Sequence, residues 1–185
     1  MEQWKPIPGY EGLYDASNLG NIRSTPGKVT SNARYDKRVW KTRIIRQKWT
    51  SRKCGKKDAR VCLWKDGKEK TYLVSRLIAL TWCDGYEDGL TVNHIDGNTE
   101  NNVPSNLEWV SRADNIRHAF YNGFCASFQK PVLLVDPDGM EHAFCSLSAA
   151  SRYLGRDSKY VSGVLRDNRL YAYSDEKRPY SVVRS

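Results

Sequence analysis

One stretch of the chain restricts the fold more than any other: residues 91–119, TVNHIDGNTENNVPSNLEWVSRADNIRHA. Its pattern predicts a short strand that ends at His94, a long polar connection, and a second short strand at Leu107–Val110. The connection begins with the turn residues Asp96-Gly97-Asn98, and its polar character and its proline argue against a helix there. A helix follows, so the stretch is typical of a small β-hairpin with a helix packed on it.

The helix after the hairpin has a clear start in the sequence. Ser111 is a favoured N-cap residue, and Asp114 stands three residues later, in the position of a capping-box partner. Asn115 and His118 come next and are three residues apart, so both lie on one face of the helix. We therefore expect this helix to present an amide and an imidazole together.

The polar residues of this stretch point to metal-assisted proton transfer. Asn93 and His94 are adjacent on the first strand, so their side chains lie on opposite faces. A helix packed across the hairpin would bring Asn115 close to this pair. Amide oxygens suit a hard divalent ion such as Mg²⁺, which also binds phosphate oxygens, and a neutral imidazole beside it can take a proton from water.

The motifs N-H-x-D-G-N, N-N, S-N-L-E-W-V and N-x-x-H together resemble the HNH nucleases, and among them the small phage and intron-encoded HNH homing endonucleases. The resemblance implies a ββα-metal core and a site-specific DNA endonuclease that uses one Mg²⁺ or Mn²⁺ ion. It implies that His94 is the general base and that Asn93 and Asn115 are the metal ligands. It also implies that Asn106 holds the hairpin loop closed and steadies the histidine.

Position 93 departs from the family pattern. Relatives often carry a metal-binding Asp there, whereas this chain has Asn93, which removes the carboxylate expected among the ligands. Free-metal affinity should therefore be weak, with DNA phosphate supplying much of the negative charge. Asp96 and His118 are alternative ligands that the sequence leaves open.

Composition excludes several classes of protein. Of the 185 residues, 39% are hydrophobic and 28% are charged, which favours several small cores over one large core. No apolar run approaches the ~18 residues of a membrane span, and the N-terminus lacks the apolar segment of a secretion signal. Five scattered cysteines without a C-x-x-C pair indicate free thiols in a reducing cytoplasm and argue against a zinc cluster.

Positive charge is concentrated in one block of the sequence. Residues 21–76 contain 18 Lys and Arg against 4 Asp and Glu, while the rest of the chain is slightly acidic. Such a block predicts a polyanion partner, here double-stranded DNA, with an anionic membrane surface and a solvated charged face as alternatives. The residues of this block that we expect to contact DNA are Arg34, Lys37, Arg38, Lys41, Arg43, Arg46, Lys48 and Arg76.

The residues before the HNH hairpin predict further small elements. Trp4–Ser24 is typical of two or three short antiparallel strands, and it resembles the small module that often precedes HNH cores. Within the basic stretch Thr25–Lys57, Val39–Trp49 is expected to be strand, and Arg60–Lys70 is expected to form a hairpin that turns at Asp66-Gly67. Thr71–Cys83 is apolar on a helical period, which predicts a helix that supports the HNH hairpin.

The C-terminal part predicts a hairpin followed by two helices. Strands are expected at 132–135 and 141–144, followed by a helix at 147–154 that Ser146 caps and that ends at Gly155. Asp157 or Ser158 would cap a second helix, 159–168. The pair resembles the helix-turn-helix repeat found after HNH cores, which implies DNA contacts by Ser158, Lys159, Tyr160, Ser162 and Arg166 of the second helix.

The sequence thus predicts an α+β chain built of modules. They are an N-terminal β module with the basic region at 1–57, an HNH (ββα-metal) core at 58–122, a linker at 123–130 and a C-terminal hairpin with a helix-turn-helix at 131–185. The predicted function is homing-type cleavage of one DNA strand by a cytoplasmic monomer, with no protein partner implied. DNA binding without catalysis and RNA binding or cleavage are the alternatives.

Overall fold

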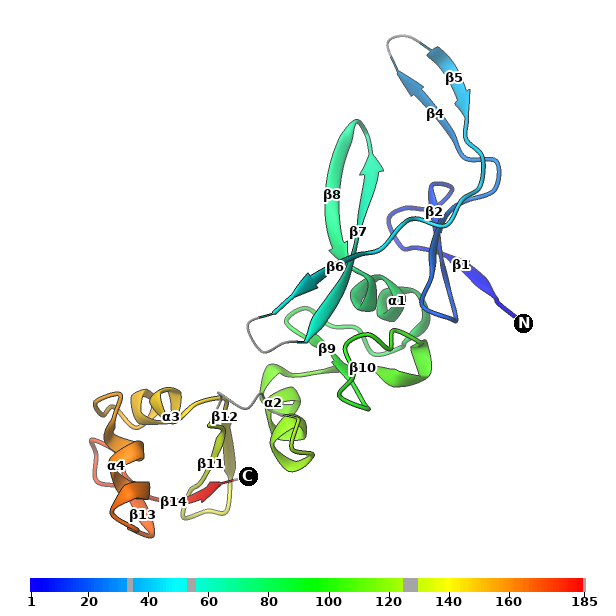
Figure 1. Ribbon diagram of the computed structural model, residues 1–185. Coiled ribbons are helices and arrows are strands. Elements are labelled where there is room, and N and C mark those ends of the chain that lie inside the picture. The colour runs from blue at the N-terminus through cyan, green and yellow to red at the C-terminus, as the bar shows by residue number, and fades with distance from the viewer. Residues whose placement is uncertain (33–34, 53–55, 125–129, 185) are drawn as a thin grey trace. The chain divides into compact units, whose positions relative to one another are not determined.

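The computed structural model describes residues 1–185 except 33–34, 53–55, 125–129 and 185. The chain divides into two compact units, Met1–Val110 and Ser111–Ser185, and each has its own cluster of buried hydrophobic residues (Figure 1). Within the described part of the chain, no helix is long and apolar enough to cross a membrane.

The first unit begins with a three-stranded antiparallel sheet. Its strands are β1 (Trp4–Pro6), β2 (Tyr14–Ser17) and β3 (Ile22–Ser24), in the order β1-β2-β3. The tight turn between β2 and β3 contains Gly20, whose φ of +82° suits glycine far better than other residues. This sheet confirms the short strands predicted for the N-terminal region.

The basic region forms a separate hairpin and part of a second sheet. β4 (Val29–Asn32) pairs with β5 (Tyr35–Val39), and this hairpin extends away from α1 in Figure 1. β6 (Lys48–Ser51), β7 (Lys57–Lys65) and β8 (Lys68–Leu73) form a three-stranded antiparallel sheet. Asp66 and Gly67 connect β7 to β8 with φ of +50° and +73°, so the predicted hairpin turn is confirmed.

Two predictions about this region are wrong in part. Residues 40–47, within the range in which a strand was expected, form no continuous strand because single backbone bonds tie them to β3 instead. The Ser24 amide donates to the Arg43 carbonyl, and the Ile45 amide donates to the Ile22 carbonyl. The supporting helix begins at Val74 and not at Thr71, because residues 71–73 belong to β8 and pair with β7.

Helix α1 (Val74–Trp82) forms the centre of the first unit's core. Its buried face presents Val74, Leu77, Ile78 and Ala79, with the spacing of an amphipathic helix. These side chains pack in one cluster with residues of β3, β7 and β10, including Leu107. The helix therefore supports the HNH hairpin, as predicted.

The HNH hairpin is formed by β9 (Thr91–His94) and β10 (Leu107–Val110). The register sets His94 opposite Leu107 and Asn93 opposite Glu108. The connection is irregular apart from one 3₁₀ turn at its end (Pro104–Asn106), with proline at the start of the turn.

The second unit is a four-stranded antiparallel sheet with helices. It contains α2 (Arg112–Tyr121), β11 (Val132–Val135), β12 (Glu141–Phe144), α3 (Leu147–Tyr153), α4 (Tyr160–Arg166), β13 (Tyr171–Tyr173) and β14 (Pro179–Arg184). The strand order is β12-β11-β14-β13, so the chain end enters the middle of the sheet. Residues of β11, α3, α4 and β13 share one buried cluster.

Two of the predicted helix starts are confirmed. The Ser111 hydroxyl accepts the amide of Asp114 at 3.0 Å, and the Ser146 hydroxyl accepts the amide of Ala149 at 3.2 Å. The predicted cap of the second C-terminal helix is wrong, because α4 begins after Lys159 without a side-chain cap. The Asp157 carboxylate instead accepts the amide of Lys159 and closes a turn before the helix.

Candidate active site

His94 lies at the end of β9, where the strand gives way to the polar loop. Its Nε2 is 3.1 Å from the side-chain oxygen of Asn102, which lies within the loop. Among the described residues, the hydrogen bonds of the His94 side chain involve Nε2 alone. The other ring nitrogen, Nδ1, is therefore the atom with which this histidine can accept a proton.

The surroundings of His94 favour the neutral imidazole. Burial is the main cause that lowers the pKa of His94, because it disfavours the charged ring. The Arg52 guanidinium acts in the same direction, while Asn102, Asp96 and Asp58 oppose it without reversing the shift. A neutral histidine at neutral pH is the form that a general base requires.

Asn106 closes the loop that carries His94. Its side-chain oxygen accepts the amide of Asp96 at 3.0 Å, and its nitrogen donates to the Asp96 carboxylate and to the Asn101 carbonyl, both at 2.9 Å. The residue is buried, so these bonds satisfy an amide that water does not reach. This geometry matches the loop-closing role expected of Asn106.

Both carboxylate oxygens of Asp96 accept hydrogen bonds from residues of the loop. One oxygen accepts the Asn98 amide at 2.8 Å as well as the Asn106 side chain, and the other accepts the Asn101 side chain at 2.8 Å. Burial alone would raise the pKa of Asp96, but these hydrogen bonds outweigh it and lower the pKa. Asp96 therefore holds the loop, which leaves it poorly suited to replace the missing metal-binding carboxylate.

Asn93 is buried on the other face of the hairpin from His94. Its side-chain nitrogen donates to the Glu108 carboxylate at 2.8 Å across the two strands. A carboxylate only accepts hydrogen bonds, so the amide nitrogen must face Glu108. The amide oxygen is then the atom that Asn93 offers to a cation.

The remaining predicted ligands lie on α2, in the second unit. Asn115 is in the first half of this helix, and its backbone amide donates to the Ser111 carbonyl. The His118 ring packs against Phe124, with the ring centres 5.5 Å apart. Both residues remain predicted ligands.

The loop is also tied to the sheet of the first unit. Lys56 donates from Nζ to the Gly97 carbonyl at 3.0 Å, and the Thr99 hydroxyl donates to the Lys57 carbonyl at 2.7 Å. Arg52, just after β6, pairs with Asp58 of β7 at 2.5 Å. Lys56 and Lys57 thus hold the loop to the sheet.

Comparison with known proteins identifies this arrangement. A family model described as the NUMOD4 motif matches residues 2–60, and one described as HNH endonuclease matches residues 82–117. DNA endonuclease I-HmuI of Bacillus phage SP01 is 33% identical over 179 residues, which are 91% of this chain and 92% of that protein. This chain belongs to the HNH homing endonucleases.

Two further similarities extend along most of the chain. A solved structure of the HNH homing endonuclease I-HmuI, described as binding and cleaving DNA, aligns over 99% of this endonuclease and 98% of that chain. The TM-score is 0.50, at 32% identity. Uncharacterized HNH endonuclease L245 of Acanthamoeba polyphaga mimivirus is 32% identical over 168 residues, 88% of this chain and 43% of that longer protein.

HNH endonucleases generally use a divalent metal ion, and the donors of this endonuclease fit one of modest affinity. Among the residues that the structure describes, no three His, Cys, Asp or Glu gather into a metal site. The amide oxygen of Asn93 is a hard donor, and Glu108, hydrogen-bonded to the same side chain, contributes a negative charge. This donor set suits Mg²⁺ or Mn²⁺ and is unsuited to structural zinc.

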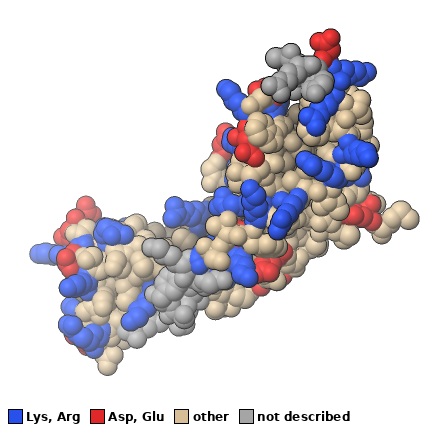
Figure 2. All heavy atoms as spheres, turned by 45° about the horizontal axis from the view of Figure 1, so that its top comes forward, with Lys and Arg blue, Asp and Glu red and all other residues tan. Residues whose placement is uncertain are grey.

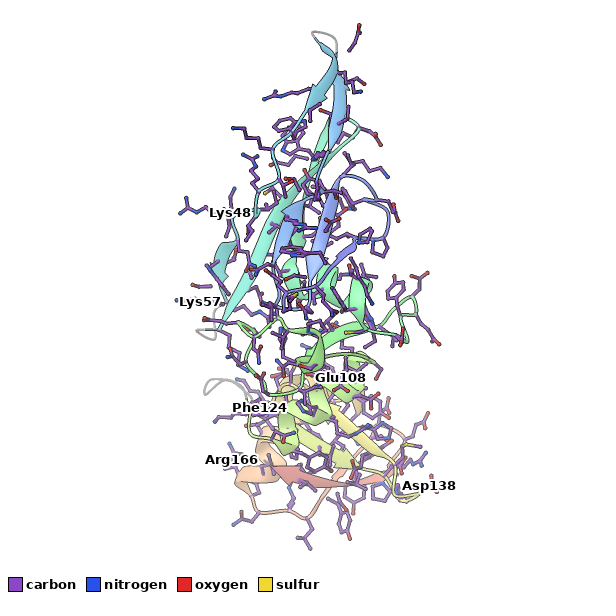
Figure 3. The ribbon with its side chains drawn as sticks, turned by 90° about the vertical axis from the view of Figure 1, so that its right-hand side faces the viewer. Lys48, Lys57, Glu108, Phe124, Asp138 and Arg166 are labelled. Atoms are coloured by element: carbon purple, nitrogen blue, oxygen red, sulfur yellow. The ribbon has the colours of Figure 1, made fainter. Side chains whose placement is uncertain are left out.

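The predicted DNA-binding residues of the first unit lie on its surface. Arg34 lies outside the described residues, while Lys37, Arg38, Lys41, Arg43, Arg46 and Lys48 are exposed. Lys and Arg side chains are spread densely over the visible face of this unit (Figure 2), and Lys48 and Lys57 project to the same side of it (Figure 3). These exposed side chains can meet a phosphate backbone, and the Arg38 guanidinium also lies 4.0 Å from the centre of the Trp40 ring.

Arg76 is the exception among the predicted DNA contacts. It projects from α1 toward aromatic rings, and its guanidinium is 5.4 Å from the centre of the Trp109 ring and 5.8 Å from that of Tyr86. The Trp109 and Tyr86 rings in turn meet edge to face. The aromatic contact fixes Arg76 beside β10.

The predicted contacts on the C-terminal helix pair divide into two groups. Ser158, Lys159, Ser162 and Arg166 are exposed. Tyr160 is not, because its ring packs on the core and its hydroxyl accepts the amide of Tyr173 at 3.0 Å. Tyr160 therefore holds α4 to β13.

Sequence reasoning missed two residues of the site, Asn102 and Glu108. Asn102 stands in an asparagine-rich run in which nothing distinguishes it from its neighbours. Glu108 lies opposite Asn93 because the hairpin register pairs Leu107 with His94. That register is not evident from the sequence alone.

Proposed function

We propose that this protein is a site-specific, metal-dependent endonuclease that hydrolyses phosphodiester bonds in double-stranded DNA. The observation that carries the proposal is the state of His94. Its imidazole is partly buried, has a lowered pKa and is bound at Nε2, in a loop that Asn106 holds closed. Such a histidine is a pre-positioned base in a protein whose relative I-HmuI is described as cleaving DNA.

In this proposal, His94 accepts a proton at Nδ1 from a water molecule as the water oxygen attacks the phosphorus atom. The bond between phosphorus and the leaving 3′ oxygen breaks, and that oxygen takes a proton from solvent. His94 then returns its proton to solvent. Asn106 acts by holding the loop and does not touch the reacting atoms.

Asn93 is the residue of the first unit that would hold one Mg²⁺ or Mn²⁺ ion, and Asn115 is the further ligand that the family resemblance implies. When bound, the ion supplies stabilisation of the negative charge that develops on the phosphate and the leaving oxygen. Asn93 is oriented for this role by its bond to Glu108, which commits the amide nitrogen and directs the oxygen away from it. The Glu108 carboxylate also supplies a negative charge beside the neutral Asn93 side chain.

DNA is held by the exposed basic residues of the first unit and by the exposed face of α4. The β4–β5 hairpin carries Lys37 and Arg38, and its narrow two-stranded form suits a DNA groove. Most of these cations would meet phosphates, which position the protein without reading the sequence. The α3–α4 pair would act as a helix-turn-helix, with Arg166 toward the backbone.

One such site per chain predicts a monomer that nicks one strand in each binding event. The test is conversion of supercoiled plasmids that carry cloned candidate targets, in Mg²⁺, in Mn²⁺ and in EDTA. We expect open circles that require the metal and that the His94→Ala variant does not produce. Cleavage by His94→Ala at the wild-type rate would contradict the proposal.

Asn93 favours one alternative function, a DNA-binding protein that keeps the HNH scaffold without catalysis. The alternative predicts tight binding of a target without conversion of the plasmid in either metal. In that case Asn93→Asp, which restores the family's carboxylate, is the variant most able to recover cleavage.

A further inference from the structure

Asn102 is the point at which the His94 loop meets the N-terminal module. It is 6% exposed, although its side chain is polar and the loop around it is largely open to solvent. Its side-chain oxygen is hydrogen-bonded to Nε2 of His94, and its backbone lies against the turn that contains Gly20. Asn102 therefore connects His94 to the N-terminal module.

The orientation of the Asn102 amide determines which nitrogen of His94 carries the proton. The Asn102 side-chain nitrogen donates to the Glu100 carbonyl at 3.3 Å, which requires the oxygen to face His94. An amide oxygen only accepts, so His94 must donate from Nε2. The neutral ring then has a free lone pair on Nδ1, the nitrogen that can take a proton from water.

Gly20 allows the N-terminal module to reach this amide. A Cβ on Gly20 would lie 3.0 Å from the Asn102 carbonyl oxygen and 3.2 Å from its carbonyl carbon, and backbone atoms cannot move aside as a flexible side chain can. The turn is itself fixed, because the Ser17 hydroxyl accepts the amides of Leu19 and Asn21 at 3.2 and 3.0 Å. The Gln47 side chain also donates to the Gly20 carbonyl at 3.0 Å.

We propose that Asn102 is a positioning residue that fixes His94 in its Nε2–H tautomer, and that the Gly20 turn of the NUMOD4 module holds Asn102 in place. The inference rests on the proposed function, in which His94 is the base. It assigns the N-terminal module a part in the active site, besides any contact that it makes with DNA. The S-N-x-G motif then serves a close approach to the nuclease loop as well as a tight turn.

The test is ¹⁵N NMR of the histidine rings in the free protein, without DNA or metal, with His94→Gln to assign the His94 signals. We expect wild-type His94 to be protonated at Nε2. Asn102→Leu, which is close in size but has no acceptor, should mix the two tautomers. Asn102→Asp, which keeps an acceptor, should preserve the Nε2–H tautomer.

Gly20→Ala and Gly12→Ala form a matched pair for the contact between the modules. Both glycines have positive φ, +82° and +72°, so both substitutions strain the backbone, but a Cβ on Gly12 meets no atom within 4 Å. We expect only Gly20→Ala to change the His94 signals. Thermal unfolding of both variants identifies any general loss of structure.

Two results would overturn the inference: wild-type His94 protonated at Nδ1, or His94 signals that Asn102→Leu and Gly20→Ala leave unchanged in folded protein. The wild-type measurement keeps the test valid even if a variant fails to fold. The proposed function fails differently, through a wild-type protein that does not cleave DNA while its tautomer is as expected. Cleavage that depends on His94 can likewise stand if the tautomer is not fixed.

Discussion

Two histidines, one in each unit, lie in hairpins that are alike in outline and differ in chemistry. His94 is bound at Nε2 by a neutral amide, and among the described residues its Nδ1 has no hydrogen-bond partner. His142, on β12, has Nε2 3.4 Å from the Asp136 carboxylate and Nδ1 3.2 Å from the Tyr153 hydroxyl. A ring that is held at both nitrogens cannot also accept a proton from substrate, so the unused nitrogen distinguishes the candidate base from the structural histidine.

The loops of the two hairpins also begin alike. Asp96 and Asp136 each accept backbone amides of the residues that follow, in the usual manner of an aspartate that starts a turn. In the first hairpin, however, Asn106 bridges both sides of a long loop, whereas in the second the turn is short and Arg178 pairs with the aspartate. The long loop contains Asn102, which lies within hydrogen-bond distance of His94.

The largest effect that this comparison predicts is on the cleavage step. His94→Ala should lower the single-turnover rate on pre-bound DNA by about 10²- to 10⁴-fold, which is the contribution of a general base. His142→Ala should leave that rate within a small factor of wild type and lower the thermal stability instead. Similar loss of cleavage in both variants would remove the distinction between the two histidines.

The second prediction compares the two loops. Asn106→Ala removes a buried amide with three hydrogen bonds, and it should lower the free energy of unfolding by about 2–3 kcal/mol as well as cleavage. Asp136→Ala should weaken the second unit and leave the cleavage step unchanged. Chemical denaturation measures the free energy of unfolding, and single-turnover kinetics measures the cleavage rate of the same variants. Full activity of a folded Asn106→Ala protein would contradict the account of the loop.

The third prediction uses two strand glutamates. Glu108→Gln removes the charge beside Asn93, so Mn²⁺ affinity, measured by electron paramagnetic resonance on the protein–DNA complex, should fall roughly tenfold. Glu141→Gln is the control, because Glu141 accepts the Tyr121 hydroxyl and pairs with Arg117 in the second unit. Equal affinities in Glu108→Gln and wild type would exclude Glu108 from the metal site.

The smallest effects concern individual phosphate contacts. Arg38→Ala on β5 and Arg166→Ala on α4 should each reduce the slope of log affinity against log salt by roughly 1, since each exposed cation neutralises one phosphate. Lys65→Ala is a suitable control, because Lys65 donates to the Gly9 carbonyl. A reduced slope for only one of the two arginines would restrict DNA binding to that unit.

The sequence was sufficient for features that local chemistry determines. The Asp66-Gly67 turn, the Ser111 and Ser146 caps and both strands of the C-terminal hairpin follow from residue type and spacing, and all are present. The loop-closing role of Asn106 came from family resemblance, and its three hydrogen bonds agree with it.

The remaining features depend on contacts between distant segments, which a single sequence does not specify. Residues 40–47 follow β3 instead of forming a strand, and the Tyr160 hydroxyl holds α4 to β13. The role of Asn102 depends on its contacts with His94 and with Gly20, which is far away in the sequence. The final strand, β14, pairs with both β11 and β13, and its pairing with β11 is also non-local.

The most direct test of the central claim, that a neutral His94 oriented by Asn102 is the base, is the pH dependence of single-turnover cleavage. A base acts only when deprotonated, and burial lowers the pKa of His94, so the wild-type rate should decline only below the usual range for histidine. In Asn102→Asp the added carboxylate raises that pKa, so the decline should begin at a higher pH. A decline at the same pH in both proteins, or at a lower pH in Asn102→Asp, would contradict the account.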